Sequence, residues 1–192
     1  MSEWQPRPPE AREVRACLRR DRERLLAWRA EQALGGAGLA FDPSYQAVWL
    51  HRWSGFLFAR GRRLPARLLW QINLFLTGAD ISPLSRFGAG LLLRCPLGVV
   101  LVGRAGADLT VGAQAVIGGG LSRRDIGAGP GLPVLGDGVE LEVGAIVLGP
   151  VRIGSGARIG PRCVVAADLP AGAAVEPEPV TLEPLREART GT

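Results

Sequence analysis

A six-residue period of aliphatic side chains runs through the second half of the chain and limits the possible folds more than any other feature. Its longest unbroken register consists of Leu135, Leu141, Val147, Ile153, Ile159 and Val165. Most of these residues precede a small residue, usually glycine. A period of six suits neither an α-helix nor an alternating strand, but it is typical of hexapeptide-repeat parallel β-helices. We therefore expect three hexapeptides per triangular coil, with the aliphatic side chains stacked inward.

The first part of the repeat is less regular. One register holds Ile81, Phe87, Leu93 and Val99, and a shorter one holds Val111 and Ile117. The nine-residue step from Val102 to Val111 predicts a coil that is three residues short. Residues 118–133 carry no aliphatic side chains at the required spacing, so we expect them to form a loop that leaves the coil. Long loops in compact domains are often functional.

The residues before the repeat predict helices. Apolar residues at helical spacing indicate a helix over 11–33, and a second helix begins after Pro43 with Ser44 as its expected N-cap. A third helix has Pro65 in its first turn and Gly78 just past its end. We expect a helical segment over 1–77, a β-helix over 78–175, and a Pro/Glu-rich tail over 176–192 with a short strand at 180–182.

Composition excludes several classes of function. The chain has a single histidine and no lysine, which argues against multi-histidine metal sites, Schiff-base lysines and P-loops. Its net charge of +5 comes from arginines on the predicted helices, without the aromatic residues of a base-stacking surface, so we expect no nucleic-acid partner. No apolar run reaches the ~20 residues of a membrane span, and the N-terminus lacks the apolar run of a signal peptide. Three widely spaced cysteines favour reduced thiols and a cytoplasmic protein.

The ordered series of motifs over residues 45–175 resembles the serine O-acetyltransferases. YQAVWLHRWSGFLFARGRRLPARLL is similar to the helical segment before their β-helix, and GADISP is similar to their V-D-I-H-P entry. LLLRCPLGVVLV resembles their L-D-H-x-x-G-V-V-I, and LTVGAQAVIGG and the coils after Leu132 follow the same order. The resemblance implies a left-handed β-helix, a homotrimer or a dimer of trimers, and acetyl-CoA or another acyl-CoA as the acyl donor.

The acceptor side of the site departs from that pattern. The family's Asp-His pair corresponds to Arg94 and Cys95, and the histidine of its R-H-P corresponds to Leu132. His51 lies in a predicted helix, where we expect a structural role. Cys95 is either a nucleophile beside Arg94 or a small apolar filler, and we favour the filler. Asp80 keeps the family's acidic position and either orients an acceptor or caps the turn into the first coil.

The donor side is better preserved. Small residues permit the close approach of a pantetheine arm, and arginine forks bind phosphate well. The resemblance assigns the following residues to CoA binding: Gly118, Gly119, Gly144, Ala145 and Arg162. We also expect Arg123 and Arg124, which lie in the loop over 118–133, to pair with the CoA phosphates.

Two functional hypotheses follow. The first is an acyl-CoA-dependent acyltransferase of serine-acetyltransferase type that acts on a small amino acid or a related hydroxyl or amine through an atypical site without a metal. The second is a catalytically degenerate homologue that serves as a binding or scaffolding partner. A cysteine synthase partnership is not expected, because family members that bind that enzyme end in isoleucine and residues 189–192 read RTGT.

Overall fold

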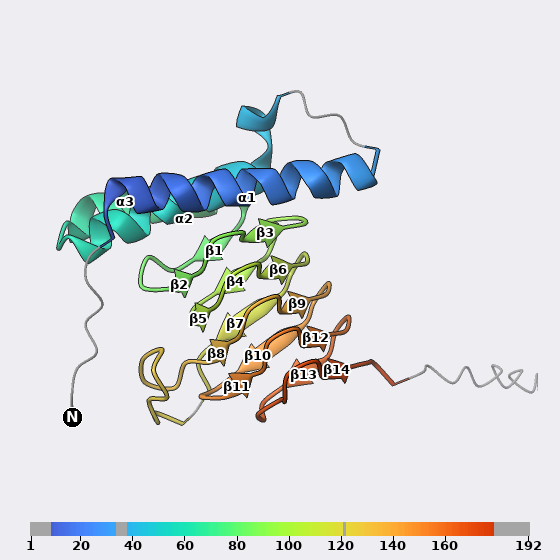
Figure 1. Ribbon diagram of the computed structural model, residues 1–192. Coiled ribbons are helices and arrows are strands. Elements are labelled where there is room, and N and C mark those ends of the chain that lie inside the picture. Colours follow the sequence, from blue (N-terminus) through green and yellow to red (C-terminus); the bar gives the residue numbers. More distant parts are fainter. Residues whose placement is uncertain (1–8, 34–37, 121, 179–192) are drawn as a thin grey trace, which may run out of the picture.

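Three helices form a layer on one end of a stack of short strands (Figure 1). The structure is a computed structural model that describes residues 9–33, 38–120 and 122–178. The helices are α1 (Ala11–Glu31), α2 (Pro43–Ala59) and α3 (Arg63–Thr77), with a 3-10 turn, η1, at Leu39–Phe41. The strand predicted at 180–182 and the C-terminal residues 189–192 lie outside the described residues.

The start of α2 differs from the sequence prediction. Asp42, not Ser44, is the N-cap, because its Oδ1 accepts hydrogen bonds from the backbone N–H groups of Ser44 and Tyr45 at 2.9 and 3.1 Å. Pro43 therefore occupies the first helical position, where its missing N–H costs nothing. The end of α3 is as predicted, since Gly78 closes that helix in the left-handed conformation.

Within the described residues, fourteen short strands build three parallel sheets along a left-handed β-helix. Sheet A contains β1 (Asp80–Ile81), β4 (Val100–Leu101), β7 (Val116–Gly118), β10 (Ile146–Leu148) and β13 (Val164–Val165). Sheet B contains β2 (Arg86–Phe87), β5 (Arg104–Ala105), β8 (Val134–Leu135) and β11 (Arg152–Ile153). Sheet C contains β3 (Leu92–Leu93), β6 (Thr110–Val111), β9 (Glu140–Leu141), β12 (Arg158–Ile159) and β14 (Ala174–Val175). Each turn of the chain visits A, B and C in order, so strands that pair are about one coil apart in the sequence.

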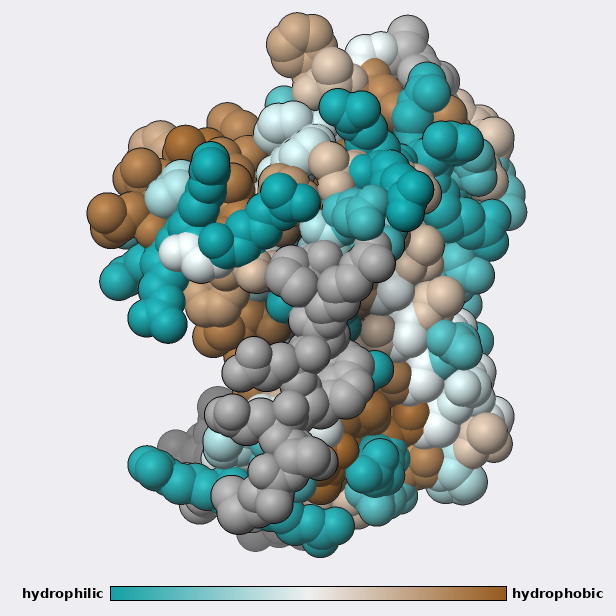
Figure 2. Space-filling view, turned by 60° about the vertical axis from the view of Figure 1, so that its left-hand side comes forward, coloured by the Kyte–Doolittle hydropathy of each residue, from teal (hydrophilic) through white to brown (hydrophobic). Residues whose placement is uncertain are grey.

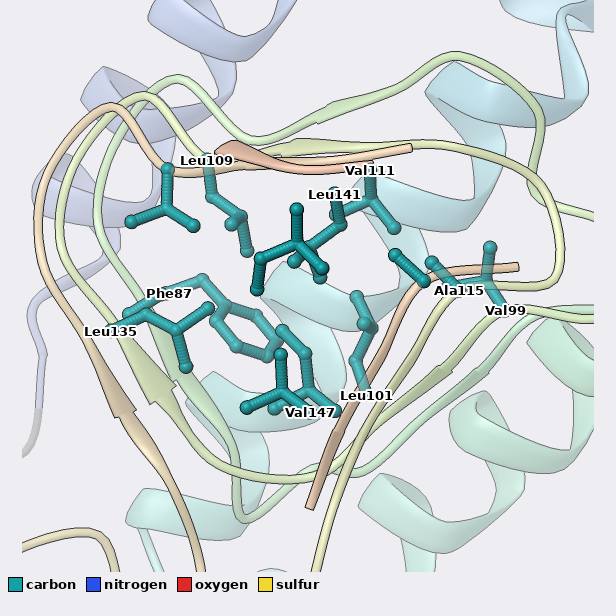
Figure 3. Packing of buried hydrophobic residues seen from close by; sticks show 14 of the residues in the cluster. Phe87, Val99, Leu101, Leu109, Val111, Ala115, Leu135, Leu141 and Val147 are labelled. Carbon is teal, nitrogen blue, oxygen red and sulfur yellow. The ribbon is translucent and has the colours of Figure 1, made fainter. Parts of the chain in front are cut away.

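The predicted aliphatic residues fill the interior of this prism (Figure 3). All six members of the long register are buried, and Val111 and Ile117 are fully buried. Because each inward side chain stacks on those of the coils above and below, the apolar area is removed from water along the whole axis, which is the main stabilising contribution in a repeat fold.

At the corner 94–99 the inward-facing position shifts by two residues relative to the predicted six-residue register. The prediction that one coil is three residues short was therefore wrong. Six residues separate β3 from β4, whereas four separate β6 from β7, so the corner 94–99 carries two extra residues. The next corner, between β4 and β5, is two residues shorter than its counterpart between β1 and β2. Leu101 therefore stacks on Ile81, while Val99 is buried at the corner. The insertion and the deletion compensate, because Val111 still follows Leu93 by three hexapeptides.

Asp21 joins the helical layer to the β-helix. Its side chain is buried and accepts hydrogen bonds from Arg52 Nε and Nη2, both at 2.9 Å, and from the backbone N–H groups of Gly90 and Leu91 at 2.7 and 2.8 Å. Removing one partner of a buried pair costs about 3–5 kcal/mol, because the other charge is left uncompensated. This cluster fixes α1 and α2 against the first coil.

The outward-facing positions give each sheet its own chemistry. On sheet A the paired residues below Asp80 are all apolar: Val100, Val116, Ile146 and Val164. On sheet B they are Arg86, Arg104, Val134 and Arg152. On sheet C the ladder contains both signs of charge, with Glu140 paired to Arg158. One face of the prism is therefore apolar, one is basic and one is charge-balanced.

Candidate active site

The corner between sheets C and A carries the turn that contains Arg94 and Cys95. Arg94 Nη1 donates to Glu142 Oε2 at 3.0 Å, and Arg158 Nη2 donates to Glu142 Oε1 at 3.1 Å. Arg94 Nη2 lies 3.8 Å from Glu140 Oε2. Two cations and two carboxylates therefore neutralise one another along this edge, and Arg94 is not an isolated positive charge.

Glu142 is a site residue that the sequence reasoning missed. Arg94, Gly112 and Glu142 occupy equivalent places in three successive coils, directly after the inward aliphatic residue. A Cβ atom on Gly112 would lie 2.7 Å from the backbone nitrogen of Val143, so only glycine fits the middle coil. The repeats themselves contained a signal, since in the described strands this place is glycine seven times and charged only at Arg94, Glu142 and, in the last strand, Glu176.

Cys95 and Asp80 lie at the same corner. Cys95 lies in the corner 94–99 that carries the two extra residues, and it is a partly exposed free thiol. Gly98 donates its backbone N–H to the carbonyl of Gly78 at 3.1 Å, which places the corner beside the start of sheet A. Asp80 Oδ1 accepts a hydrogen bond from Trp70 Nε1 at 2.8 Å. The carboxylate is therefore held by an α3 side chain rather than by the turn that it was proposed to cap.

Three of the residues assigned to the donor lie further along this edge. Gly144 and Ala145 form the corner between β9 and β10, and Arg162 forms the corner between β12 and β13. Arg162 has a backbone φ of +58° and an exposed side chain. A Cβ atom on Gly144 would lie 3.3 Å from Arg162 Cγ, so the arginine stem rests on the glycine backbone.

The other four donor residues lie at the opposite edge of sheet A. Gly118 ends β7, and Gly119 begins the excursion that runs to Pro133. Arg123 and Arg124 are exposed on that excursion, where the backbone carbonyl of Arg124 accepts from Gly131. One chain thus brings the three proposed acceptor-side residues, Asp80, Arg94 and Cys95, to the same edge of sheet A as three of the donor residues: Gly144, Ala145 and Arg162. The other four donor residues lie at the opposite edge of that sheet: Gly118, Gly119, Arg123 and Arg124.

His51 is not part of this corner. It lies in α2, 3% exposed, with its ring 5.4 Å from the ring of Phe87 on sheet B. Burial, with smaller contributions from Arg52 and Arg86, lowers the pKa of His51 to about 3. A base this weak removes a proton from a hydroxyl poorly.

Two further observations concern the described ranges 9–33, 38–120 and 122–178. No group of three or more His, Cys, Asp or Glu side chains there is arranged to hold a metal ion. None of the helices in these ranges is long and apolar enough to cross a bilayer.

Comparison with known proteins assigns the chain to a family. Residues 133–167 match the family model described as bacterial transferase hexapeptide (six repeats). The serine acetyltransferase of Helicobacter pylori strain J99 is 34% identical over 136 residues, which cover 70% of this chain and 77% of that protein. The chain belongs to the serine acetyltransferase family.

Other serine acetyltransferases agree with this assignment. The protein from Mycobacterium tuberculosis is 37% identical over 135 residues, 69% of this chain and 57% of its own length, and the chain spans 54% of the Synechococcus elongatus relative. The chain thus covers little more than half of these two relatives. Among solved structures, soybean serine acetyltransferase aligns with a TM-score of 0.77 at 26% identity, over 88% of this chain and 68% of that one.

Proposed function

We propose that the chain transfers an acetyl group from acetyl-CoA to a small amino acid or a related hydroxyl or amine, at the corner formed by Asp80, Arg94 and Cys95. Membership of the serine acetyltransferase family carries this proposal. The soybean and Neisseria gonorrhoeae relatives were solved in complex with serine, and a further structure of the same fold was solved in complex with CoA. We also expect a cytoplasmic setting, because three widely spaced cysteines favour free thiols over a disulfide framework.

The acceptor half of the site works without an imidazole base in this proposal. The acceptor attacks the thioester carbonyl, the bond from carbon to sulfur breaks, and the CoA thiolate takes up the acceptor's proton. A hydroxyl needs base assistance worth roughly 10²–10⁴ in rate, and the only histidine is buried away from the corner. An acceptor amine that is already unprotonated needs less help, so we expect amines or substrates with their own base to be favoured over serine.

The proposed donor site needs two chains. Arg162 and Gly144 lie on one edge of sheet A, and Arg123 and Arg124 lie on the other. Packing the apolar outer face of sheet A around a threefold axis would bring the first edge of one copy to the second edge of the next. The exposed apolar residues of α3 offer a second contact, through which two trimers would associate: Leu64, Leu68, Ile72, Leu74, Phe75 and Leu76. Apolar residues gather on the helical layer in Figure 2.

Light scattering tests the assembly. We expect a mass of three or six times 20.3 kDa for the wild type. Val116→Glu with Val164→Glu on sheet A should give monomers, because carboxylates would be buried unpaired in the interface. Ala174→Glu, on the outer face of sheet C, is the matched control and should leave the mass unchanged. A monomeric wild type would contradict the trimer.

Thiol release tests the activity. Purified protein with acetyl-CoA should release free thiol in the presence of a small amine or amino acid, and more slowly with serine. Calorimetry with acetyl-CoA should show binding. Absence of acetyl-CoA binding would overturn the proposal and favour the alternative, a degenerate homologue that acts as a binding partner.

A further inference from the structure

A cavity lies on sheet B, away from the corner of the proposed active site. Its volume is about 800 Å³, and its walls come from α1, α2, sheet B and the middle of the excursion, at Ile126 and Gly127. Cavities of this size bind ligands up to the size of a nucleotide. None of the residues proposed for acetyl transfer lines it.

Arg86 presents an uncompensated charge to this cavity. Its side chain is half-buried, and burial lowers its pKa. Within the part of the chain that the structure describes, Arg86 makes no hydrogen bond or ion pair. Its register partner on the neighbouring strand is Arg104, so the nearest cross-strand charge has the same sign. A desolvated cation in this position is unfavourable until an anion joins it.

The other charged groups on the cavity wall, Arg104 included, are already engaged. Glu13 accepts a hydrogen bond from the backbone N–H of Glu10, and Asp137 accepts one from that of Ala107. Arg52 is paired with Asp21. Arg152 donates to the carbonyl of Ile126. No acidic side chain of the wall is therefore directed to Arg86 by any of these contacts.

His51 supplies an independent sign of a missing ligand. His51 also lines the cavity, and only 3% of its surface is exposed to solvent. Its Nδ1 atom has no hydrogen-bond partner. The ring forms a hydrogen bond with the backbone of Ile81 through its other nitrogen, and the imidazole is neutral, so Nδ1 is an acceptor. Buried polar atoms without partners are rare in native proteins, and each one calls for a physical explanation.

We propose that this cavity binds a small oxyanion compound that also carries a hydroxyl or amine donor, with its phosphate or carboxylate on Arg86 and its donor on Nδ1 of His51. Arginine forks match both oxyanions, and the charge-assisted bonds they form are shorter and stronger than neutral ones. The bound anion compensates the charge of Arg86, and the donor satisfies the orphaned nitrogen. The inference does not rest on acetyl transfer, because the two sites share no residue.

Calorimetry with three probes tests the binding. Glycerol 3-phosphate and glycerate each combine hydroxyl donors with one type of oxyanion, and glycerol is the uncharged control. We expect one or both anions to bind the wild type, more weakly at higher salt, and glycerol not to bind. The stronger of the two anions identifies the oxyanion class. Binding of neither anion overturns the proposal.

Three arginine variants locate the site. Arg86→Ala should weaken the anion at least 10-fold, while Arg22→Ala, which removes the same charge from an exposed position on α1, should not. Arg162→Ala should also leave anion binding intact. Loss of binding in Arg162→Ala, or wild-type binding in Arg86→Ala, would place the anion elsewhere and overturn the proposal.

Two measurements separate a binding role from a structural one. Without ligand, Arg86→Ala should melt at a higher temperature than the wild type, because an unpaired half-buried cation is removed; a lower melting temperature would show a structural pairing and contradict us. With ligand, the Nδ1 resonance of the only histidine should shift, since it accepts a new hydrogen bond. An unchanged resonance at saturating ligand would exclude the contact with His51.

Discussion

Arg94 and Glu142 form an ion pair that bridges an entire coil, with Nη1 and Oε2 3.0 Å apart across the backbone of Gly112. The two residues are 48 positions apart in the sequence. Their pairing changes the character of the corner, because a cation that would repel an acceptor ammonium is balanced by the carboxylates of Glu140 and Glu142.

A double-mutant cycle measures this pair. Both side chains are partly shielded from water, so we expect Arg94→Ala and Glu142→Ala to couple by about 1 kcal/mol in urea unfolding. Arg94→Ala with Asp137→Ala is the control, and these effects should add because the residues share no contact. Additive losses for Arg94 and Glu142 would show that the pair contributes nothing to stability.

Restoring the family's base tests the proposed acceptor site. Arg94→Asp alone would face two glutamates, so the designed variant combines Arg94→Asp, Cys95→His and Glu142→Gly, with Leu132→His as an addition. Serine acetylation, followed by thiol release, should rise by up to roughly 10²–10⁴. The control carries Cys95→Ala in place of Cys95→His and should stay slow.

The wild type gives two informative outcomes in the same assay. Rapid serine acetylation that survives Cys95→Ala would mean that the reacting turn lies elsewhere. Rapid acetylation that Cys95→Ala abolishes would make Cys95 the catalyst, not a filler.

Arg162 is expected to contribute to CoA affinity. Losing one charge-assisted hydrogen bond costs ~1.5–3 kcal/mol, so Arg162→Ala should weaken CoA about 10- to 150-fold in calorimetry. Gly144→Ala should weaken it too, because the added methyl presses on Arg162 Cγ and the backbone φ of +69° disfavours alanine. Arg158→Ala, on sheet C, is the control; equal losses in Arg158→Ala and Arg162→Ala would indicate a general charge effect.

The single histidine predicts a specific pH dependence of stability. In the unfolded chain His51 titrates near 6.5, but in the folded protein its pKa is about 3. As the pH falls below 6.5 the unfolded state takes up a proton that the folded state refuses, so stability is lost by up to about 1.4 kcal/mol per pH unit.

Urea unfolding between pH 5.5 and 7.5 checks this effect, because carboxylates titrate mostly below that window. His51→Gln should flatten the dependence, since no other histidine is present. A wild-type free energy of unfolding that stays constant from pH 7.5 to 5.5 would contradict the burial of a neutral ring.

The sequence alone determined the repeat, the excursion and the helical layer. Each of these features depends on local spacing: six residues per side of the prism, a break in that spacing over 118–133, and helical periodicity before Gly78. The sequence did not reveal which residues of the first register face inward after Leu93. The two extra residues at 94–99 are offset by two missing residues one corner later, and only the strand pairing of Leu101 with Ile81 shows this compensation.

The tertiary structure decided which side chains act together. Coiling turns residues roughly 18 positions apart into neighbours, so the apolar ladder of sheet A and the basic ladder of sheet B come from positions that look unrelated along the chain. The Arg94–Glu142 pair also depends on a glycine in the intervening coil, and the state of His51 depends on its burial against Phe87. Local spacing fixes the path of the backbone, whereas charge and protonation depend on distances through space that the path creates.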